Sequence, residues 1–380
     1  MRLKIDTPFL LAELPDGSAR LYQHAIEIIQ TSEGDQVRPA LQRARAALRA
    51  GHHVAGFLCY EAGAVLQSKD IVSQPHALPL VWFGVFPSPR RCSTQDLATM
   101  FPETQSAGTS CLRFDCTEAE YQAMFHRVRD LIRAGDIYQA NLTVRASVSF
   151  VSAPTQIYAA IRHRARARHA AMIWTGSDWI LSFSPESFFE LRGRRVIARP
   201  MKGTAARGRD IAADEAAIEQ LRSDPKERAE NLMIVDLMRN DLARLSRPGS
   251  VHVPHLFEVE TYPTVHQMIS TVCAEVHQDV DAIDILETAF PAGSITGAPK
   301  IRAMEVIAAL EPQPRGLYCG SIGWMDPGGD ASFNVAIRTI HIDRSGHHGR
   351  LGLGSGIVAD SDASREWREC QTKGLFLCGT

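Results

Sequence analysis

Two kinds of hydrophobic pattern are interleaved along this chain. Residues 117–135 and 224–245 place apolar side chains every three or four positions, which predicts helices with one buried face. Residues 171–183 and 186–203 instead form pairs of strand-like arms around short glycine-containing turns, which predicts hairpins. Because these arms join without an intervening helix, we expect antiparallel or mixed sheets and an α+β fold.

The clearest helix signals lie at two helix starts. Thr117 and Glu120 have the spacing of a capping box, and Asp224 can cap a second helix whose first turn holds Pro225. Apolar positions in this second helix recur every three or four residues, so we expect one buried stripe made of Leu232, Val235, Met238, Leu242 and Leu245.

The apolar pattern is interrupted between Pro87 and Gly108, where Pro, Ser, Thr and Gln accumulate. No internal repeat is visible on either side of this stretch. We therefore place a subdomain boundary here, with an N-terminal subdomain at residues 1–110 and the larger part of the chain at residues 111–380.

Charge narrows the range of partners. The 41 lysines and arginines are balanced by 43 aspartates and glutamates, for a formal net charge of −2, so no overall positive field attracts nucleic acid or an anionic membrane. One dense basic run, residues 162–169, follows a helical pattern without interleaved aromatics and is predicted to be a solvated helix end. We expect no nucleic-acid partner.

Hydropathy and cysteine usage favour a cytoplasmic protein. No segment approaches the ~18 uncharged residues of a membrane span, and the first residues do not resemble a secretion signal. The eight cysteines are scattered without a CxxC pair or a zinc-binding spacing, which favours reduced thiols. We expect no membrane partner.

Lys202 stands out because it lies between a Pro-Met step and a Gly-Thr step at the end of the second hairpin. If that hairpin turns at Gly193, residues whose numbers sum to about 388 face each other, which places Glu186 opposite Lys202 within a residue or so. A surface salt bridge is one interpretation of this pair, and a reacting lysine beside an acid is another. A phosphate-binding loop is excluded, because there the lysine follows the glycine and a helix comes next.

Two predicted helices each carry a Glu-x-x-Glu pair. Glu227 and Glu230 lie three apart near the start of one helix, and Glu366 and Glu369 repeat the arrangement near the C-terminus. Four such carboxylates would suit one hard divalent cation such as Mg²⁺. Solvated helix faces often carry the same spacing, so the alternative is two exposed acidic pairs.

A loop of small residues precedes a predicted helix whose first residue is Pro299. The amides of Gly297 and Ala298, with the hydroxyls of Ser294 and Thr296, would suit an anion at the start of this helix. Ordinary helix capping explains the same residues.

Two features nearer the C-terminus suit a carboxylate ligand. Gly354 and Gly356 lie in an extended glycine-rich segment, where a ligand can approach the backbone closely. A dinucleotide-binding loop is excluded, because no helix follows this segment directly. Arg338, on the preceding predicted strand, suits a two-pronged contact with a carboxylate, and an ordinary surface arginine is the alternative.

Taken together, these stretches resemble the chorismate-utilising enzymes, which include the large subunits of anthranilate synthase and aminodeoxychorismate synthase as well as isochorismate and salicylate synthases. The resemblance runs from about residue 117 to residue 377, and it rests on the motifs "SPESFFEL", "RPMKGT", "ERAENLMIVDLMRNDLARL", "VETYPTVHQMIS", "GSITGAPKIRAME", "GLYCGSIGW", "NVAIRTI" and "GLGSGIVADS…EWRE". It implies a layered α+β sandwich of two large mixed or antiparallel sheets flanked by helices. Residues 1–110 would contribute to this sandwich, and residues 111–380 would form the chorismate-binding catalytic core.

The residue at position 202 indicates a branch of this family. The "MKGT" form is similar to component I of aminodeoxychorismate synthase, where this lysine is taken as the nucleophile, whereas anthranilate synthases typically carry alanine there. "DIYQANLT" and the "YEAG" at Tyr60 also resemble that branch. Anthranilate synthases carry a histidine at the position of Gln267, and here the nearby histidine is His266, one residue earlier, which we count among the candidate substrate-binding residues.

The resemblance implies a Mg²⁺-dependent reaction of chorismate with ammonia that gives 4-amino-4-deoxychorismate. Mg²⁺ would be held by Glu230 and Glu369, with Glu227 and Glu366 in or near its coordination shell. Lys202 would attack the ring, with Glu186 as general acid. The remaining substrate contacts implied by the resemblance are Ser294, Thr296, Gly297, Ala298, Tyr318, Arg338, Gly354 and Gly356.

The source of ammonia is expected to lie outside this chain, because no cysteine lies in a nucleophile-elbow context. The resemblance implies a separate glutamine amidotransferase subunit, and a separate pyridoxal-phosphate lyase that completes 4-aminobenzoate for folate synthesis. Anthranilate or isochorismate synthesis is the nearest alternative. A catalytically idle regulatory or binding subunit is an alternative of another class, and such a subunit would tolerate loss of the lysine and the acidic residues, all of which are present.

Overall fold

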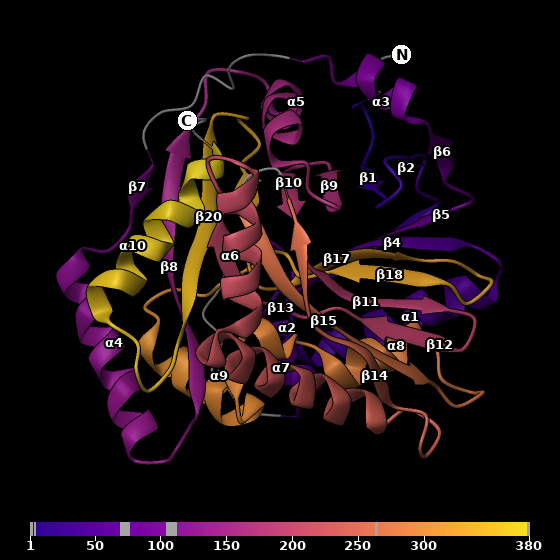
Figure 1. The fold of residues 1–380 in the computed structure, drawn as a ribbon. Coiled ribbons are helices and arrows are strands. Elements are labelled where there is room, and N and C mark those ends of the chain that lie inside the picture. The colour runs from indigo at the N-terminus through magenta and orange to yellow at the C-terminus, as the bar shows by residue number, and fades with distance from the viewer. Residues whose placement is uncertain (1–2, 4, 69–76, 104–111, 263–264, 378–380) are drawn as a thin grey trace.

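The computed structural model describes residues 3, 5–68, 77–103, 112–262 and 265–377. Most of these residues belong to two large sheets and the helices that cover them (Figure 1). Every strand pairing in the described residues is antiparallel. The predicted α+β class and the sandwich of two large sheets are confirmed.

The first sheet has ten strands. Their order is β16 (Gly297–Ala298), β8 (Gln139–Ser149), β20 (His348–Ile357), β19 (Thr339–Ile342), β10 (Trp179–Ser184), β9 (His169–Trp174), β1 (Phe9–Glu13), β2 (Ala19–Tyr22) and β6 (Arg90–Cys92), with β7 (Arg113–Phe114) paired to β8. The longest ladder joins β8 to β20, and this ladder carries the glycine-rich segment.

The second sheet also has ten strands. Their order is β13 (Met201–Ala206), β15 (Val265–Glu275), β12 (Arg195–Ala198), β11 (Ser187–Arg192), β18 (Ala331–Asn334), β17 (Ser321–Met325), β4 (His53–Leu58), β5 (Val81–Phe86) and β3 (Glu27–Thr31), with β14 (His252–Thr261) paired to β15. Both predicted hairpins are present, as β9–β10 and β11–β12.

The inner faces of the two sheets pack on each other, and the helices cover the outer faces. The inner layer includes Leu10 and Ile180 of the first sheet and Phe57 and Trp82 of the second, all fully buried. The first sheet is covered by α3 (Thr94–Met100), α4 (Glu118–Arg133), α5 (Pro154–Ala165), α9 (Lys300–Leu310) and α10 (Ala363–Gly374). The second sheet is covered by α1 (Val37–Arg49), α2 (Ala62–Leu66), α7 (Pro225–Ala243) and α8 (Ala282–Ala289), and α6 (Ile211–Ser223) packs against β13 and α7.

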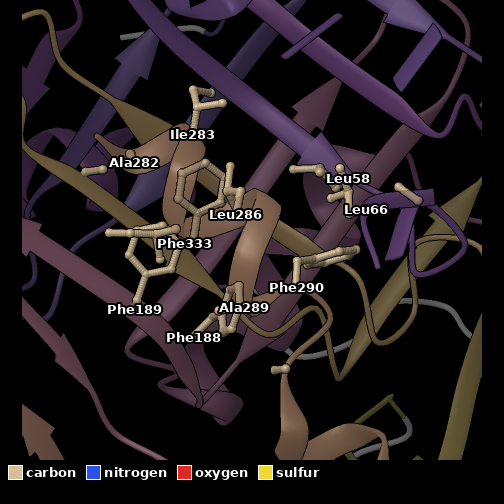
Figure 2. Packing of buried hydrophobic residues seen from close by; sticks show 14 of the residues in the cluster. Leu58, Leu66, Phe188, Phe189, Ala282, Ile283, Leu286, Ala289, Phe290 and Phe333 are labelled. Carbon is tan, nitrogen blue, oxygen red and sulfur yellow. The ribbon is translucent and has the colours of Figure 1, made fainter. Parts of the chain in front are cut away.

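The outer core of the second sheet is dominated by aromatic and branched side chains. Phe188, Phe189 and Phe333 of adjacent strands pack against Ile283 and Leu286 of α8 (Figure 2). Burial of each such side chain contributes about 1.5–3 kcal/mol. This packing fixes β11, and with it the start of the hairpin that leads to Lys202.

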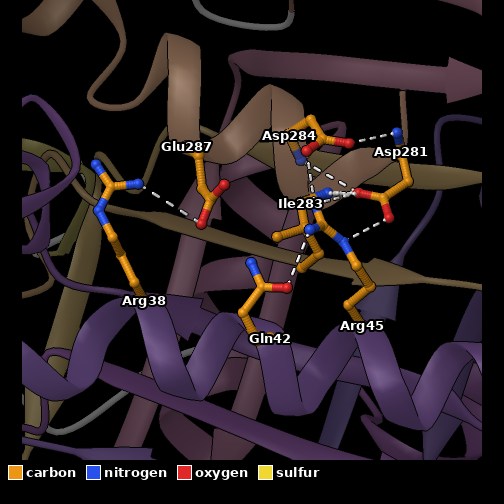
Figure 3. Close-up of polar contacts among 7 residues, drawn as sticks. All are labelled: Arg38, Gln42, Arg45, Asp281, Ile283, Asp284 and Glu287. Atoms are coloured by element: carbon orange, nitrogen blue, oxygen red, sulfur yellow. Dashed lines mark hydrogen bonds and ion pairs between the residues drawn. The ribbon is translucent and has the colours of Figure 1, made fainter. Parts of the chain in front are cut away.

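Ion pairs join α1 to α8 on the outside of this core. Arg45 contacts Asp281 at 2.8 Å and Asp284 at 2.6 Å, and Arg38 lies 3.8 Å from Glu287 (Figure 3). Asp281 also caps α8 by accepting hydrogen bonds from the first-turn amides. The N-terminal part of the chain is therefore anchored to a helix that precedes the predicted anion loop.

Residues before position 110 supply strands to both sheets, namely β1, β2 and β6 to the first and β3, β4 and β5 to the second. Part of the predicted boundary stretch lies outside the described residues. The division of the chain at residue 110 stays a prediction.

Helix starts were predicted well, and the buried stripe of α7 was predicted less well. Thr117 and Glu120 form the expected capping box, and Asp224 caps α7. Leu232, however, is 43% exposed, so its place in the predicted stripe was wrong. The buried face instead includes Asn231 and Asp241, because these polar side chains find buried hydrogen-bond partners.

The basic run that begins in the last turn of α5 is less solvated than predicted. Arg162 pairs with Glu13 at 2.6 Å, and Arg164 donates to the carbonyl of Leu377 at 2.9 Å. The run therefore joins α5 to other parts of the fold, because long arginine side chains reach distant acceptors that sequence spacing does not reveal.

No helix in the described part of the chain is long and apolar enough to span a membrane. Six of the cysteines lie in the described residues, and each has a free thiol. Cys111 and Cys378 lie outside the described residues. The expected cytoplasmic location stays a prediction.

Candidate active site

Lys202 lies against the glycine-rich strand of the opposite sheet. A Cβ atom built on Gly356 would collide with Lys202 Nζ, so the missing side chain of this glycine makes room for the lysine. Four residues earlier on the same face, a Cβ on Gly352 would collide with the ring of Tyr318. The lysine of the second sheet and the tyrosine therefore both lie over the bare face of β20.

Carboxylates surround the Lys202 ammonium group. Glu230 Oε2 lies 3.1 Å from Lys202 Nζ, and both side chains are largely buried. Burial alone would lower the pKa of Lys202, but the negative charges of Glu230, Glu369 and Glu227 outweigh it and raise the pKa. Arg199 and Arg207, which lie close to Lys202 in sequence, instead pair with Glu260 and Asp214.

Glu186 is the second titratable group of the site. It is 5% exposed, and its Oε1 accepts a hydrogen bond from Ser294 Oγ at 2.6 Å. Burial raises the Glu186 pKa to about 7, although the Ser294 hydrogen bond and the charge of Lys202 act in the opposite direction. An acid with this pKa can donate a proton at neutral pH.

The hairpin register brings Glu186 close to Lys202, as predicted. The observed β11–β12 ladder runs from Arg192 opposite Arg195 to Glu190 opposite Ile197, and Glu186 and Met201 lie just beyond the ends of these two strands. The Met201 amide hydrogen bonds to the Glu186 carboxylate, and the Lys202 charge acts on that carboxylate. A surface salt bridge is excluded for this pair, because both residues are buried.

The four predicted metal-binding glutamates come from α7 and α10. In the described residues, no three acidic, histidine or cysteine side chains are grouped as metal ligands, and lysines approach the carboxylates instead. Lys373 contacts Glu369 at 2.7 Å, and Lys226 lies 4.0 Å from Glu230. Glu366 is buried at 6% exposure on the inner face of α10.

The donor type of this cluster nevertheless fits a hard divalent cation. Glu227, Glu230 and Glu369 all act on the Lys202 ammonium, so carboxylates from both helices converge on one point of positive charge. Burial, followed by repulsion from Glu230, raises the Glu227 pKa. Oxygen ligands of this kind suit Mg²⁺, and the metal site stays a prediction.

The loop of residues 294–298 is packed into the fold more tightly than expected. Thr296 Oγ1 donates to the Ala292 carbonyl at 2.8 Å, and Gly297 and Ala298 form strand β16 against β8. Helix α9 begins at Lys300 with Pro299 as its N-cap, one residue later than predicted. Gly297 has φ = 146°, and a Cβ there would collide with the carbonyl of Gln139, so glycine is required.

A buried arginine that sequence reasoning missed holds this loop in place. Arg315 donates to the carbonyls of Ile295 at 2.9 Å and Asn141 at 2.6 Å, and it forms a two-pronged ion pair with Glu311. Its guanidinium group also lies 4.5 Å from the ring centroid of Tyr60, in the "YEAG" stretch. Glu311 lies only four residues away, but the carbonyl acceptors of Ile295 and Asn141 lie far from Arg315 in sequence, so no local pattern marks its role in holding the loop.

We expect Arg315→Leu to lower the free energy of unfolding by about 3–5 kcal/mol, because Glu311 would remain as a buried charge without its partner. Urea denaturation measures this loss. The matched control is Arg302→Leu on α9, whose ion pair with Glu305 is exposed and contributes under about 1 kcal/mol. Equal losses in the two variants would contradict the structural role of Arg315.

Arg338 has the properties expected of a residue that binds an anionic ligand. It is half-buried, has φ = 48°, and forms no ion pair in the described part of the chain. Burial lowers the Arg338 pKa, because no carboxylate offsets the cost of removing the guanidinium group from water. A carboxylate ligand would supply that charge.

His266 does not share these properties. It is fully buried, its Nε2 lies 2.9 Å from Asp214 Oδ1, and its Nδ1 lies 3.0 Å from Thr261 Oγ1. Both ring nitrogens are therefore engaged by protein groups, and neither remains for a substrate while these contacts hold. The predicted substrate contact by His266 has no support in this geometry.

Gln139 is a site residue that sequence reasoning did not single out. It is fully buried, and neither atom of its amide has a hydrogen-bond partner in the described residues. A Cβ on Gly356 would lie 3.0 Å from Gln139 Nε2, so the amide lies beside Lys202 over the same glycine. Unpaired buried amides are costly, which suits a group that hydrogen bonds to a ligand. No local signal marked Gln139, because polar residues recur at every second position of β8.

The chain belongs to the chorismate binding enzyme family, whose family model matches residues 6–378. It is 43% identical over 261 residues to aminodeoxychorismate synthase component 1 of Klebsiella aerogenes, and the aligned region covers 69% of this chain and 57% of that protein. It is 40% identical over 284 residues to anthranilate synthase component 1 of Streptomyces coelicolor, covering 74% and 55%. The crystal structure of anthranilate synthase component I from Streptococcus pneumoniae superimposes with a TM-score of 0.83 at 26% identity, over 99% of this chain and 93% of that one. The chain thus spans little more than half the length of the curated relatives it matches.

Proposed function

We propose that this chain converts chorismate and ammonia to 4-amino-4-deoxychorismate, as an aminodeoxychorismate synthase component 1. The observation that carries the proposal is the buried Lys202 over Gly356, beside an acid with a pKa of about 7. A lysine nucleophile requires this arrangement, whereas direct displacement by water or ammonia does not. Similarity to relatives of that name supports the same branch.

Substrate binding follows from the unpaired polar groups. Arg338 binds one carboxylate of chorismate in two-pronged fashion, and the Gln139 amide hydrogen bonds to the ring substituents. Gly354 and Gly356 let the substrate approach the backbone of β20, and Tyr318 covers that strand. The loop of residues 294–298 closes the site beside Glu186 through the Ser294 hydrogen bond.

The chemistry consists of two displacements. The neutral Lys202 amine forms a bond to C2 of the ring, both ring double bonds shift by one position, and the C4–oxygen bond breaks so that the hydroxyl leaves as water with a proton from Glu186. Ammonia then forms a bond to C4, the double bonds shift back, and the C2–nitrogen bond breaks to release Lys202. The enolpyruvyl group stays on the product throughout.

Glu230 and Glu369, with Glu227 and Glu366 beside them, are the residues that would hold Mg²⁺. A bound cation would offset the charge of these carboxylates, which raise the Lys202 pKa, and would supply positive charge for the ring carboxylate of the substrate. The chain's own contribution is to place two Glu-x-x-Glu pairs on helices that face one lysine.

Ammonia would come from a separate glutamine amidotransferase subunit, which associates transiently with this chain. The product would pass to a separate pyridoxal-phosphate lyase on the route to 4-aminobenzoate and folate. Association with the amidotransferase is tested by comparing glutamine and ammonium as nitrogen sources in the mixed proteins.

The test of the proposed function is mass-spectrometric identification of the product from the purified chain, chorismate, Mg²⁺ and ammonium at mildly alkaline pH. We expect a product that keeps the enolpyruvyl group and gains an amine, and that is stable until a lyase is added. Anthranilate, with loss of pyruvate, or isochorismate would instead place the chain in another branch. No turnover with an intact fold would favour a regulatory subunit.

A further inference from the structure

Lys202 lies in a β-bulge at the edge of the second sheet. Met201 faces Ile269 and Thr204 faces Gln267, so the two residues between them on β13 face a single residue on β15. Gly203 has φ = 99°, a conformation that glycine adopts readily and that other residues rarely do. A bulge of this kind bends its strand and changes the direction in which a side chain points.

The bulge removes two backbone carbonyls from the regular hydrogen-bond ladder. Two side-chain amides donate hydrogen bonds to these carbonyls instead. Asn231 Nδ2, on α7, donates to the carbonyl of Lys202 at 3.3 Å. Gln267 Nε2, on β15, donates to the carbonyl of Gly203 at 2.9 Å. The carbonyls on both bulge residues are therefore held by side chains from different elements.

The hydroxyl group of Ser270 fixes the orientation of the Asn231 amide. Ser270 Oγ accepts a hydrogen bond from the Phe257 amide at 3.1 Å and donates to Asn231 Oδ1 at 2.6 Å. Because the asparagine oxygen is engaged by Ser270, its NH₂ group must point to Lys202. Asn231 and Ser270 are both fully buried, so water does not replace these bonds.

The Gln267 amide is oriented in the same way. Thr204 Oγ1, at the end of the bulge, donates to Gln267 Oε1 at 3.0 Å, which leaves Gln267 Nε2 to bind Gly203. A leucine of similar volume at either amide position would leave a bulge carbonyl without its donor.

We infer that Asn231 and Gln267 are positioning residues that hold the Lys202–Gly203 bulge and thereby direct Lys202 at Gly356. Neither residue touches the reacting atoms, and both act through the backbone of the lysine. The effect on turnover rests on the proposed function. The placement of the lysine side chain does not, and it can be measured separately.

The test measures the reaction of Lys202 with acetic anhydride in the full-length chain, by peptide mass spectrometry in the presence of EDTA. The variants are Asn231→Leu, Gln267→Leu and the double variant. Lys300, buried against Asp241, is an internal reporter of global opening. Tyr158→Phe, which removes a buried hydroxyl bonded to Glu13, is the matched control for loss of a buried hydrogen bond.

Each single variant is expected to acetylate at Lys202 at least about fivefold faster than the wild type, with Lys300 unchanged. Turnover with ammonium should fall about 10- to 100-fold in kcat with KM nearly unchanged, because small misplacements of a reacting group cost this much. The losses in the double variant should be less than additive, since both amides hold one bulge. Tyr158→Phe should leave the labelling of Lys202 unchanged.

Labelling of Lys202 within twofold of the wild type in both single variants would overturn the inference, whatever happens to turnover. Wild-type kcat in Gln267→Glu, where Gln267→Leu is impaired, would also overturn the inference. Glutamate keeps the shape of Gln267 but lacks the donor to Gly203. If the wild type forms no aminated product, the proposed function fails, and the labelling comparison still decides the positioning role.

Discussion

Lys202→Ala is expected to lower the kcat for 4-amino-4-deoxychorismate formation by a factor on the order of a thousand or more, because it removes the nucleophile and with it both displacement steps. Product formation from chorismate, ammonium and Mg²⁺, followed by mass spectrometry, measures this loss. KM should change much less, since Arg338 and the backbone of β20 provide the binding contacts.

Two variants separate nucleophilicity from charge. Lys202→Arg keeps a cation beside Glu230 but cannot attack, because a guanidinium group stays protonated, so it should be as inactive as alanine. Lys226→Ala removes a lysine that lies 4.0 Å from the same carboxylate without reaching β20, and it should keep most of the activity. More than about a tenth of wild-type kcat in Lys202→Ala would exclude a covalent step through this lysine.

Glu186→Gln is expected to lower kcat by about 10²- to 10⁴-fold, because the C4 hydroxyl would lose its proton donor. The same substitution should stabilise the protein above neutral pH. The Glu186 pKa is about 7 in the folded chain, against 4.5 for an unperturbed glutamate, so the folded state holds a proton that the unfolded state releases between these values.

The sign of the pH effect follows from this difference. As the pH rises from about 4.5 to 7, the wild type loses up to about 3 kcal/mol of stability, the cost of ionising a buried carboxyl group. Glutamine carries no such cost, so the variant should be more stable than the wild type at pH 8 and similar at pH 4.5. Urea denaturation at the two pH values, without substrate or metal, measures the difference.

Glu190→Gln is the matched control, because Glu190 lies on β11, four residues after Glu186, and is only partly buried. This variant should leave both activity and the pH dependence of stability nearly unchanged. A Glu186→Gln variant that is less stable than the wild type at pH 8 would show that Glu186 is ionised and well paired in the folded chain. That result would exclude Glu186 as the general acid at neutral pH.

Features decided by nearby residues could be predicted from the sequence. The turn at Gly193 sets the hairpin register, and extending this register predicted that Glu186 lies near Lys202, as the structure shows. The caps of α4 and α7 depend on side chains within three residues, and both form as expected. Sheet order could not be obtained this way, because it depends on pairings between distant segments.

Features decided by distant partners were missed for the same reason. Asn231 reads as an ordinary polar position until Ser270 and the Lys202 carbonyl are seen beside it. Arg315 reads as a surface arginine until its acceptors on three other segments are known. His266 shows the reverse case, because adjacency to a family motif suggested a substrate contact, while the fold engages both of its ring nitrogens elsewhere.

The distribution of the first strands over both sheets constrains how the protein folds. Leu10 of β1 pairs with Ile173, and Leu58 of β4 pairs with Ser321, so early segments wait for partners that are synthesised much later. The chain entropy lost in closing such long loops is offset only after the distant strands have paired. Assembly is therefore slow, and unpaired strand edges are exposed until it is complete. During synthesis, β1 therefore has no β9 beside it until nearly half of the chain has been made, and β4 has no β17 until most of the chain has been made.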